Sequence, residues 1–332
     1  MTIRDYAPAD RDEFLRLMRD AWGEESMRVD EFAWWFERNP TGRLELAVAE
    51  EDGSVLGVLG ATAMPMRLDG AERLGSFSVH GTTAAAARGK GIFQLLERYN
   101  EERSAATGIA CVLAFASAPT ARLFTQRLGW SRLGKRRLWA RLLRAGAPVR
   151  HLRSRGDGAG RLHAASDEAR AYGAVKVVPL TRFGPATDTL YERAAAAWGS
   201  HVVRRAEHLN WRYLDSPWDY RAFASIRDGE LSGYAVVRAK RHRGAPLAVL
   251  ADLVAPAGFG DARALVRRCI AEVEHADAIV TLPPRGKAQR LALAASGFLP
   301  APLTLDFMGR PLQERFTLPT DWHLSLGDTD FF

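Results

Sequence analysis

The stretch Arg88-Gly89-Lys90-Gly91-Ile92-Phe93 decides the fold, because it joins a predicted strand near residues 74–82 to a predicted helix over residues 89–106. Two glycines at a strand-to-helix turn allow backbone amides to approach a ligand closely. The start of a helix carries a partial positive charge, and Arg88 and Lys90 add formal charge. Together these features predict an anion site, and a pyrophosphate is the occupant that suits it.

Two common phosphate loops do not fit this stretch. A Walker A loop needs Gly-x-x-x-x-Gly-Lys-Ser/Thr, which the chain lacks. A dinucleotide-binding loop needs Gly-x-Gly-x-x-Gly after the first strand of a βαβ unit. Here the third glycine is missing, and the loop follows several strands with antiparallel character. Both interpretations are excluded.

A mixed α/β arrangement surrounds the loop. Apolar residues at helical spacing predict helices over 10–22, 30–38, 89–106 and 119–128. Apolar segments bounded by turns predict strands over 44–49, from 55 onward, 74–82, 110–116 and 130–143. In the helix after the loop, Leu95, Leu96 and Tyr99 form the predicted apolar face. The order of elements indicates an α/β fold with a mixed sheet.

The second half of the chain repeats this order. A tryptophan-bearing helix, a proline, a strand, an Asp-Gly turn and a strand recur, and then come a strand (247–255), a helix (261–275) and a strand (278–282). Trp34 and Trp211 are 177 positions apart, and Gly53 and Gly229 are 176 apart. The offset from Leu128-Gly129-Trp130 to Ser296-Gly297-Phe298 is 168. Such near-constant offsets predict an internal duplication and two tandem domains.

The loop resembles the acyl-CoA pyrophosphate loop of the GCN5-related N-acetyltransferase (GNAT) superfamily, whose pattern is Arg/Gln-x-x-Gly-x-Gly/Ala. Arg88 and Gly91 match this pattern, whereas Phe93 replaces its final small residue. The order of elements agrees, and Leu128-Gly129-Trp130 resembles the end of the family's fourth helix. The resemblance covers residues 1–145 well and 170–310 weakly, as a second copy of the fold. It implies two tandem GNAT-like domains in an α/β chain.

The resemblance also implies how the chain is divided. Residues 1–145 would form a GNAT domain with the acyl-CoA loop, and residues 146–170 a basic linker. Residues 171–332 would form a second, degenerate GNAT-like domain that shapes the acceptor site. This second copy has Pro-Ala-Gly-Phe-Gly-Asp-Ala-Arg at positions 256–263, where Asp261 would repel a pyrophosphate. The C-terminal segment 322–330 resembles tails of tandem members found with glycan or lipid biosynthesis.

The implied activity is an acyl-CoA-dependent N-acyltransferase, in which a primary amine attacks the thioester directly and no metal takes part. The implied co-substrate, acetyl-CoA or a longer acyl-CoA, would be held by Thr82, Thr83, Arg88, Gly89, Lys90, Gly91, Ile92 and Phe93. The family places the thioester where two parallel strands diverge, here those that carry residues 78–83 and 112–117.

Catalytic candidates follow from this placement. His80 suits proton removal because its ordinary pKa of about 6.5 is near neutrality; a structural histidine is the alternative. The family's usual general acid is a tyrosine on the fourth helix, and Phe124 stands at that position. The acid is therefore unassigned, with Ser117 and Tyr99 as substitutes.

Other prominent residues have structural interpretations. Trp34, Trp35, Trp198 and Trp211 are expected to fill the core, although Trp211-Arg212-Tyr213 would alternatively line an acceptor cleft. Asp252 lies on a predicted central strand, where a carboxylate is costly unless it is paired. It either has a structural hydrogen-bond partner or binds an acceptor amine.

Composition limits the class of protein. The chain has 332 residues, 47% hydrophobic and 26% charged, and a formal net charge of +7, which favours anionic partners. Cys111 and Cys269 offer no disulfide framework, and the histidines no metal-site spacing. The first residues lack an apolar signal core. We therefore expect a cytoplasmic protein, and no nucleic-acid-binding motif is present.

Residues 131–161 contain ten Arg or Lys and one acidic residue, Asp157. They are either a solvated strand edge with a linker or a basic surface for phosphate or anionic lipid, which would bring the protein to the inner face of a membrane. Three functions remain open: acetyl transfer to a small amine; long-chain transfer to a lipid (sphingoid-type) amine, as in a bacterial ceramide synthase; and a non-catalytic acyl-CoA sensor. Acceptor, acyl length and oligomeric state stay unassigned.

Overall fold

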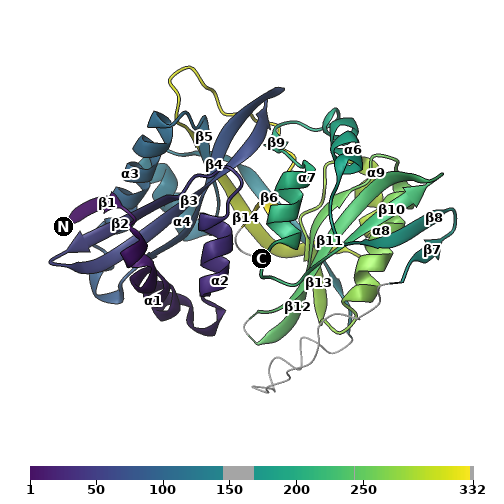
Figure 1. Cartoon of the computed structure of the whole chain (residues 1–332), viewed down its shortest axis with the longest axis horizontal. Coiled ribbons are helices and arrows are strands. Elements are labelled where there is room, and N and C mark those ends of the chain that lie inside the picture. Colours follow the sequence, from purple (N-terminus) through teal and green to yellow (C-terminus); the bar gives the residue numbers. More distant parts are fainter. Residues whose placement is uncertain (145–167, 243, 330–332) are drawn as a thin grey trace. The chain divides into compact units, whose positions relative to one another are not determined.

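The computed structural model describes residues 1–144, 168–242 and 244–329, and most of the expected basic linker lies outside these ranges. The chain forms two compact units (Figure 1). Unit 1 comprises residues 1–136 and 305–321, and unit 2 comprises residues 137–304 and 322–332. Each unit therefore contains a segment from the other half of the chain.

Unit 1 is built on a mixed sheet with the strand order β1-β2-β3-β4-β5-β14. These strands are β1 (Thr2–Asp5), β2 (Glu45–Glu51), β3 (Ser54–Leu68), β4 (Ala71–Thr83), β5 (Cys111–Ala116) and β14 (Leu299–Pro311). The helices are α1 (Arg11–Trp22), α2 (Val29–Phe32), α3 (Ile92–Ala106) and α4 (Ala118–Leu123), and π-helical turns, η3 (Ala33–Glu37) and η5 (Phe124–Leu128), extend α2 and α4. All pairings are antiparallel except β4 with β5.

Unit 2 repeats this plan with the strand order β6-β13-β12-β11-β10-β8-β7. The strands are β6 (Ser131–Leu142), β7 (Arg170–Tyr172), β8 (Val175–Leu180), β10 (Tyr220–Arg227), β11 (Glu230–His242), β12 (Ala245–Val254) and β13 (Ala278–Thr281), and a short β9 (His201–Val202) is not part of this strand order. The helices are α6 (Pro185–Ala195), α7 (Ala206–Leu209), α8 (Phe259–Glu272) and α9 (Lys287–Ala295), with the π-helical turn η6 (Asn210–Leu214) after α7.

The duplication extends to irregular details. Both η3 and η6 are five-residue π-helical turns, 177 positions apart. Asp52-Gly53 and Asp228-Gly229 both have positive φ angles, as a two-residue hairpin turn requires. The register of β4 against β3 and of β12 against β11 is interrupted by a bulge in each unit. Two copies of one fold explain these matches.

The last strand of each unit comes from the other half of the chain. β5 pairs with residues 306–311 of β14, and β13 pairs with residues 139–142 of β6. The compact units therefore differ from the contiguous boundaries expected at 145 and 171. Sequence landmarks locate each repeat along the chain but carry no information about which distant strand completes its sheet.

Of the tryptophans expected in the core, Trp34, Trp35 and Trp211 are buried, whereas Trp198 is half-buried. Trp34 and Trp35 are each 1% exposed and stack edge-on. Trp211, Arg212 and Tyr213 are buried too, which rules out the alternative that they line an open cleft.

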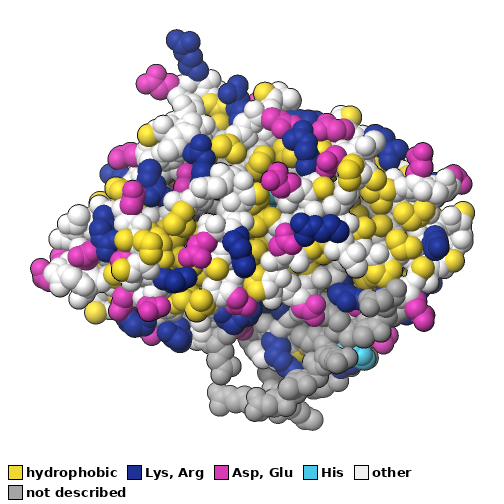
Figure 2. Space-filling model, viewed as in Figure 1, with side chains coloured by type: hydrophobic (Ala, Val, Ile, Leu, Met, Phe, Trp, Pro, Cys, Tyr) yellow, Lys and Arg dark blue, Asp and Glu magenta, His cyan; other side chains and the backbone are white. Residues whose placement is uncertain are grey.

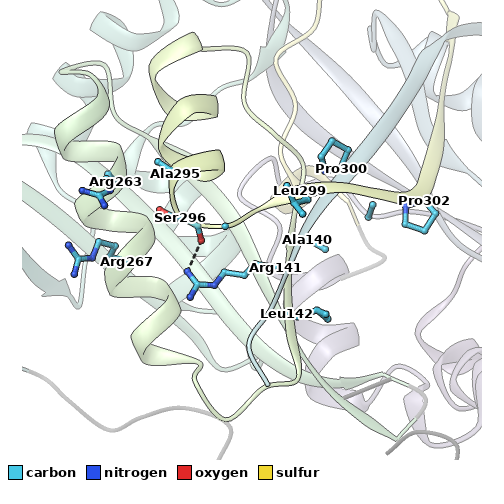
Figure 3. Close-up of a pocket in the computed structure, with 12 residues that line it drawn as sticks. Ala140, Arg141, Leu142, Arg263, Arg267, Ala295, Ser296, Leu299, Pro300 and Pro302 are labelled. Carbon is cyan, nitrogen blue, oxygen red and sulfur yellow. Dashed lines mark hydrogen bonds between the residues drawn. The ribbon is translucent and has the colours of Figure 1, made fainter. Parts of the chain in front are cut away.

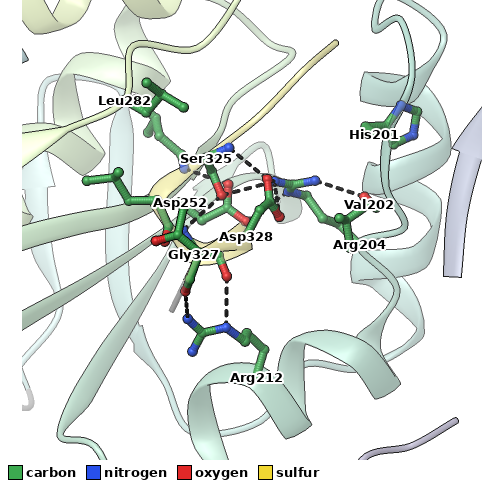
Figure 4. A network of polar contacts seen from close by, with 12 residues as sticks. His201, Val202, Arg204, Arg212, Asp252, Leu282, Ser325, Gly327 and Asp328 are labelled. Atoms are coloured by element: carbon green, nitrogen blue, oxygen red, sulfur yellow. Dashed lines mark hydrogen bonds and ion pairs between the residues drawn. The ribbon is translucent and has the colours of Figure 1, made fainter. Parts of the chain in front are cut away.

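A buried ionic network fastens the C-terminal segment to unit 2 (Figure 4). Arg204 is 1% exposed; its Nε donates to Asp252 at 3.0 Å and its Nη2 to Asp328 at 2.9 Å. Tyr213 and Tyr234 also donate to Asp252. Asp252 therefore has the structural role that the sequence left open.

A second arginine holds the same segment through its backbone. Arg212 Nε donates to the carbonyl of Gly327 at 2.8 Å, and its Nη2 donates to that of Thr329 at 3.1 Å. Residues 322–329 are all buried, whereas Asp321 just before them is exposed, so the tail is part of the core of unit 2.

We expect Arg204→Met to lower the free energy of unfolding by about 3–5 kcal/mol, because it leaves two buried carboxylates without their cation. Urea denaturation measures the change. Arg182→Met removes an exposed partner of Asp215 (side chains 63% and 49% exposed) and should cost below about 1 kcal/mol. Equal losses in the two variants would contradict the importance of the buried network.

Candidate active site

The two parallel strands before and after α3 diverge within unit 1. β4 and β5, both fully described, pair at Ser76 with Val112 and at Phe77 with Leu113. Beyond these pairs β4 continues to Thr83 and β5 to Ala116. The facing edges there have no strand between them to satisfy their amide and carbonyl groups. An extended ligand with its own amides suits such an opening.

A β-bulge lies on β4 within the same opening. Val58 of β3 pairs with Thr82 and Gly60 pairs with Val79, so His80 and Gly81 together face one residue of β3. His80 has a φ of 51°, which is uncommon for a residue other than glycine. A bulge leaves backbone groups outside the ladder and changes the direction of nearby side chains.

The imidazole of His80 lies against aromatic side chains of η3. Its ring centroid is 5.4 Å from that of Trp35 and 5.8 Å from that of Phe36, both edge-on. Trp35 is itself fixed, because its Nε1 donates to Thr62 Oγ1 at 2.6 Å. His80 is half-buried as a residue, and its Nε2 is buried, so its ring is oriented by packing.

The loop after β4 has the backbone geometry of an anion site. Gly89 and Gly91 have φ angles of 83° and 76°, and Gly91 is the N-cap of α3. The amides of Gln94 and Leu95 donate to the carbonyl of Gly91 at 3.1 and 3.2 Å. The amides of residues 92 and 93 belong to the set that a helix start leaves without an intrahelical acceptor.

The remaining loop candidates surround these amides. Arg88 and Lys90 are exposed, Thr82 is buried, and Thr83 is half-buried at the end of β4. Ile92 is buried against Gly57 of β3, where any larger side chain would collide with it. Close contact with β3 fixes the start of α3.

Phe93 fills the position where the resemblance expects a small residue. A Cβ added to Gly81 would lie 2.9 Å from its ring, so the ring packs directly on the bulge of β4. On its other side the ring lies 5.9 Å from that of Phe124. Phe93 thus spans from β4 to the helix that follows β5 and forms an apolar wall of the opening.

The two candidate proton donors from the sequence, Ser117 and Tyr99, lie in different parts of unit 1. Ser117 is exposed just after β5, and its Oγ is 3.0 Å from Thr120 Oγ1 in the first turn of α4. Tyr99 donates to Asp5 on β1, at the far edge of the unit 1 sheet from β5. Tyr99 is therefore not positioned as an acid at the opening.

A carboxyl group that the sequence analysis missed lies at the opening. Glu97 of α3 is 1% exposed, and its Oε2 accepts a hydrogen bond of 2.7 Å from Ser78 Oγ. Ser78 is the first residue of β4 beyond the last pair with β5. Burial, with a smaller contribution from the neighbouring Glu101, raises the pKa of Glu97 to about 8. The group is mostly protonated at neutral pH.

Glu97 belongs to a buried polar stripe of α3 that the predicted apolar face did not include. Leu96 is buried and Tyr99 packs against the same core, as predicted, whereas Leu95 is 39% exposed, and Glu97, Asn100, Glu101 and Ser104 point inward. Glu101 accepts from Trp130 Nε1 at 2.6 Å and from Arg310 Nη1 at 2.7 Å. Their spacing places these four side chains on one helical face, and each has a partner that the sequence alone does not reveal.

The corresponding helix start in unit 2 carries its own anion. Asp261, fully buried in the first turn of α8, accepts from Ser232 Oγ at 2.5 Å and from Arg227 Nη2 at 2.8 Å. A carboxylate there already interacts favourably with the helix dipole. The repulsion expected from the sequence thus has a structural basis.

Unit 2 also has an open pocket of about 870 Å³ between β6, α8, α9 and β14 (Figure 3). Its lining includes Arg141, Arg263 and Arg267, together with Leu142 and Leu299. Arg141 Nη1 donates to the carbonyl of Ser296 at 2.6 Å. No acidic residue is among the described residues that line it.

Two absences hold for the described ranges. They contain no cluster of three or more His, Cys, Asp or Glu that could hold a metal ion. They also contain no helix of the length and apolarity needed to cross a membrane. On the face in Figure 2, Lys and Arg side chains are interspersed with Asp and Glu.

Residues 2–133 match the family described as Acetyltransferase (GNAT) domain. This part of the chain is a GNAT domain. The resemblance inferred from Arg88, Gly91 and the order of elements is thereby confirmed, and with it the class of enzyme, an acyl-CoA-dependent N-acyltransferase. No match was found among curated proteins.

Solved structures share the fold of the whole chain, although the sequences have diverged. A GCN5-related N-acetyltransferase from Anabaena variabilis matches with a TM-score of 0.65 at 13% identity, over 94% of this chain and 72% of that one. Saccharomyces cerevisiae N-myristoyltransferase with bound myristoyl-CoA and inhibitors has a TM-score of 0.65 at 12% identity, over 100% and 86%. Eis1 from Mycobacterium abscessus has 0.57 at 17%, over 94% and 74%. The tandem GNAT-like α/β fold predicted from the sequence is confirmed.

Because the pKa of Glu97 is raised in the folded state, the stability of the fold depends on pH. A carboxyl whose pKa is higher in the folded than in the unfolded state stabilises the fold below its unfolded pKa and loses that contribution as pH rises through the folded value. Glu97→Gln keeps a neutral group, so its unfolding temperature relative to wild type should rise between about pH 4.5 and about pH 8 and stay level above that. Thermal scans across that range measure it, and a constant difference would contradict the shift.

Proposed function

We propose that unit 1 binds acyl-CoA and catalyses transfer of its acyl group to a primary amine. One observation carries this proposal: the glycine loop and the start of α3 directly follow the strand that diverges from β5. The loop supplies an anion site, and the opening offers a place for an extended thioester arm. Both are needed to hold a CoA thioester in one orientation.

Contacts for each part of the donor follow from the loop. The amides of residues 91–93, with the side chains of Arg88 and Lys90, would bind the pyrophosphate. Thr82 and Thr83 would lie along the pantetheine. The bulge at His80 and Gly81 leaves a backbone amide outside the ladder, which suits it to the oxyanion that develops at the carbonyl.

The corresponding helix start in unit 2 does not suit a pyrophosphate, and this supports assigning acyl-CoA binding to unit 1. Asp261 supplies a buried carboxylate at the start of α8, and that carboxylate disfavours a pyrophosphate there. Residues 322–329, which include the short helical turn η7 (Leu326–Asp328), pack on β12 and are held by Arg204. Unit 2 would therefore shape the acceptor site rather than bind a second CoA.

Two side chains near the opening serve the amine. His80 would accept the proton that the amine loses on attack, because a neutral imidazole is a base near pH 7. Ser117, exposed at the end of β5, would hydrogen-bond the incoming acceptor.

Binding of acyl-CoA should raise the unfolding temperature, and Gly91→Glu should abolish the rise, because a carboxylate enters the anion site. At roughly a hundred times Kd the apparent stabilisation is about 2.7 kcal/mol. Thermal scans with CoA, acetyl-CoA and a C16 acyl-CoA measure it. Gly258→Glu, at the matching positive-φ glycine before α8, is the control and should keep the ligand-induced shift.

The pattern of shifts also separates the alternatives. No shift in wild type would refute the donor assignment, and a shift without turnover on any amine would favour an acyl-CoA sensor. A larger shift with the C16 donor would favour a lipid amine, as in a bacterial ceramide synthase. An equal or larger shift with acetyl-CoA would favour a small polar amine.

The pocket of unit 2 favours the lipid acceptor as a second candidate. Arg141, Arg263 and Arg267 line it without an acidic neighbour, and Leu142 and Leu299 are 64% and 69% exposed. Guanidinium groups beside exposed leucines match the phosphates and acyl region of an anionic bilayer. The N-myristoyltransferase with the same fold is described with bound myristoyl-CoA, a long-chain donor.

We expect the protein to sediment with vesicles containing anionic lipid at low salt and to bind less at high salt. Arg263→Gln with Arg267→Gln should weaken binding severalfold. Arg19→Gln with Arg38→Gln removes the same charge from exposed positions in unit 1 and should have little effect. Equal weakening by both pairs would mean that net charge alone drives the association.

A further inference from the structure

The family position for the proton donor holds Phe124, which carries no acidic proton, so a thiolate leaving unit 1 needs another source. Phe124 is 2% exposed and stacks on Trp130 with ring centroids 4.2 Å apart. Phe93 covers its other side. No rearrangement of these packed rings provides a hydroxyl.

We propose that Ser78 and Glu97 form the proton-donating pair for the departing thiolate, with Ser78 in contact with the leaving sulfur and Glu97 behind it. This inference rests on the proposed acyl transfer in unit 1. Ser78 is half-buried and lies two residues before the bulge, at the narrow end of the opening between β4 and β5. Glu97 is its 2.7 Å partner.

The surroundings of Glu97 suit a donor. Glu101 lies one turn further along α3. Arg310 of β14 pairs with Glu101 at 2.7 Å, and its charge also lowers the pKa of Glu97. Ser78 faces it from β4. Because Arg310 is engaged by Glu101, Glu97 is left without a neutralising cation among these neighbours and keeps its proton, consistent with its raised pKa.

The helix geometry places Glu97 beside the acyl arm rather than at the pyrophosphate. Phe93 and Glu97 are four positions apart on α3 and therefore lie on one face. Phe93 contacts the bulge at Gly81, and Glu97 contacts Ser78 three residues earlier on β4. The pair therefore lies deeper in the opening than the wall formed by Phe93.

The proton balance closes without another reactant. The amine nitrogen forms a bond to the carbonyl carbon, and the carbon–sulfur bond breaks as the oxyanion collapses. For the transfer the hydrogen bond between the two side chains reverses: the hydroxyl proton of Ser78 turns from Glu97 Oε2 to the thiolate, and the protonated carboxyl of Glu97 donates its proton to Ser78 Oγ. The proton released by the amine passes to His80 and from there to solvent, and one from solvent restores Glu97.

The test compares Glu97→Gln with wild type in steady-state acyl transfer. Gln keeps a neutral partner for Ser78 but has no proton to give, so kcat should fall roughly 100-fold or more while KM for acyl-CoA stays the same. Wild-type kcat should decline above about pH 8, where Glu97 loses its proton, and the variant should lack that decline.

Glu45→Gln is the matched control, because it removes another buried carboxyl of unit 1, on β2, which accepts from Ser104 of α3 and does not face Glu97. It should keep wild-type kcat and the alkaline decline even where its unfolding temperature falls. Ser78→Ala should lower kcat as Glu97→Gln does, and Ser78→Thr, which restores the hydroxyl, should recover most of it. If Glu97→Gln does not fold, the comparison of Ser78→Ala with Ser78→Thr tests the proposed proton-donating pair instead.

The outcomes separate this inference from the proposed function. Wild-type protein without transfer activity on any donor and amine would refute the function itself. Active wild type with an unchanged kcat and alkaline decline in Glu97→Gln would refute the proton-donating pair alone.

Discussion

The separation of β4 from β5 is the constraint on which the site depends. Once pairing ends at Phe77 and Leu113, both strands present backbone groups that need partners, and buried polar groups are rarely left without them. The bulge at His80, the glycine loop and the start of α3 follow in sequence along the same stretch of chain. A short continuous segment therefore provides both the polar edge and the anion site.

How far the sequence could predict the structure depended on how local each feature is. The glycine loop at 88–93 and the Asp-Gly turns are local, since they depend on which residues tolerate a positive φ. The exchange of β6 and β14 between the units is not local. Each strand keeps the same apolar pattern whichever sheet it completes, so the pattern does not reveal its partner. Glu97 was missed for a related reason: a glutamate on a helix has the pattern of a solvated face, and only tertiary contacts with Ser78 show that it is buried.

Unit 2 shows how the same fold supports a different use. Its helix start is neutralised from within by Asp261, and β12 bears a buried carboxylate, Asp252, held by Arg204. Replacing an external ligand by internal charges converts a binding surface into a core, at the cost of burying ions that must all be paired. The tail completes this pairing through Asp328, so the stability of unit 2 depends on the final residues of the described chain.

The exchanged strands have a consequence for biosynthesis. A ribosome releases the chain from its N-terminus, and 190 positions separate Ala116 of β5 from its partner Asp306 of β14. During that interval β5 remains an open sheet edge, the kind of surface that recruits other strands. Unit 1, although its first segment precedes unit 2 in the sequence, is completed only after most of unit 2 has been synthesised. A gene cut between its repeats would yield two incomplete sheets, so after this exchange the duplicated halves are inherited as one folding unit.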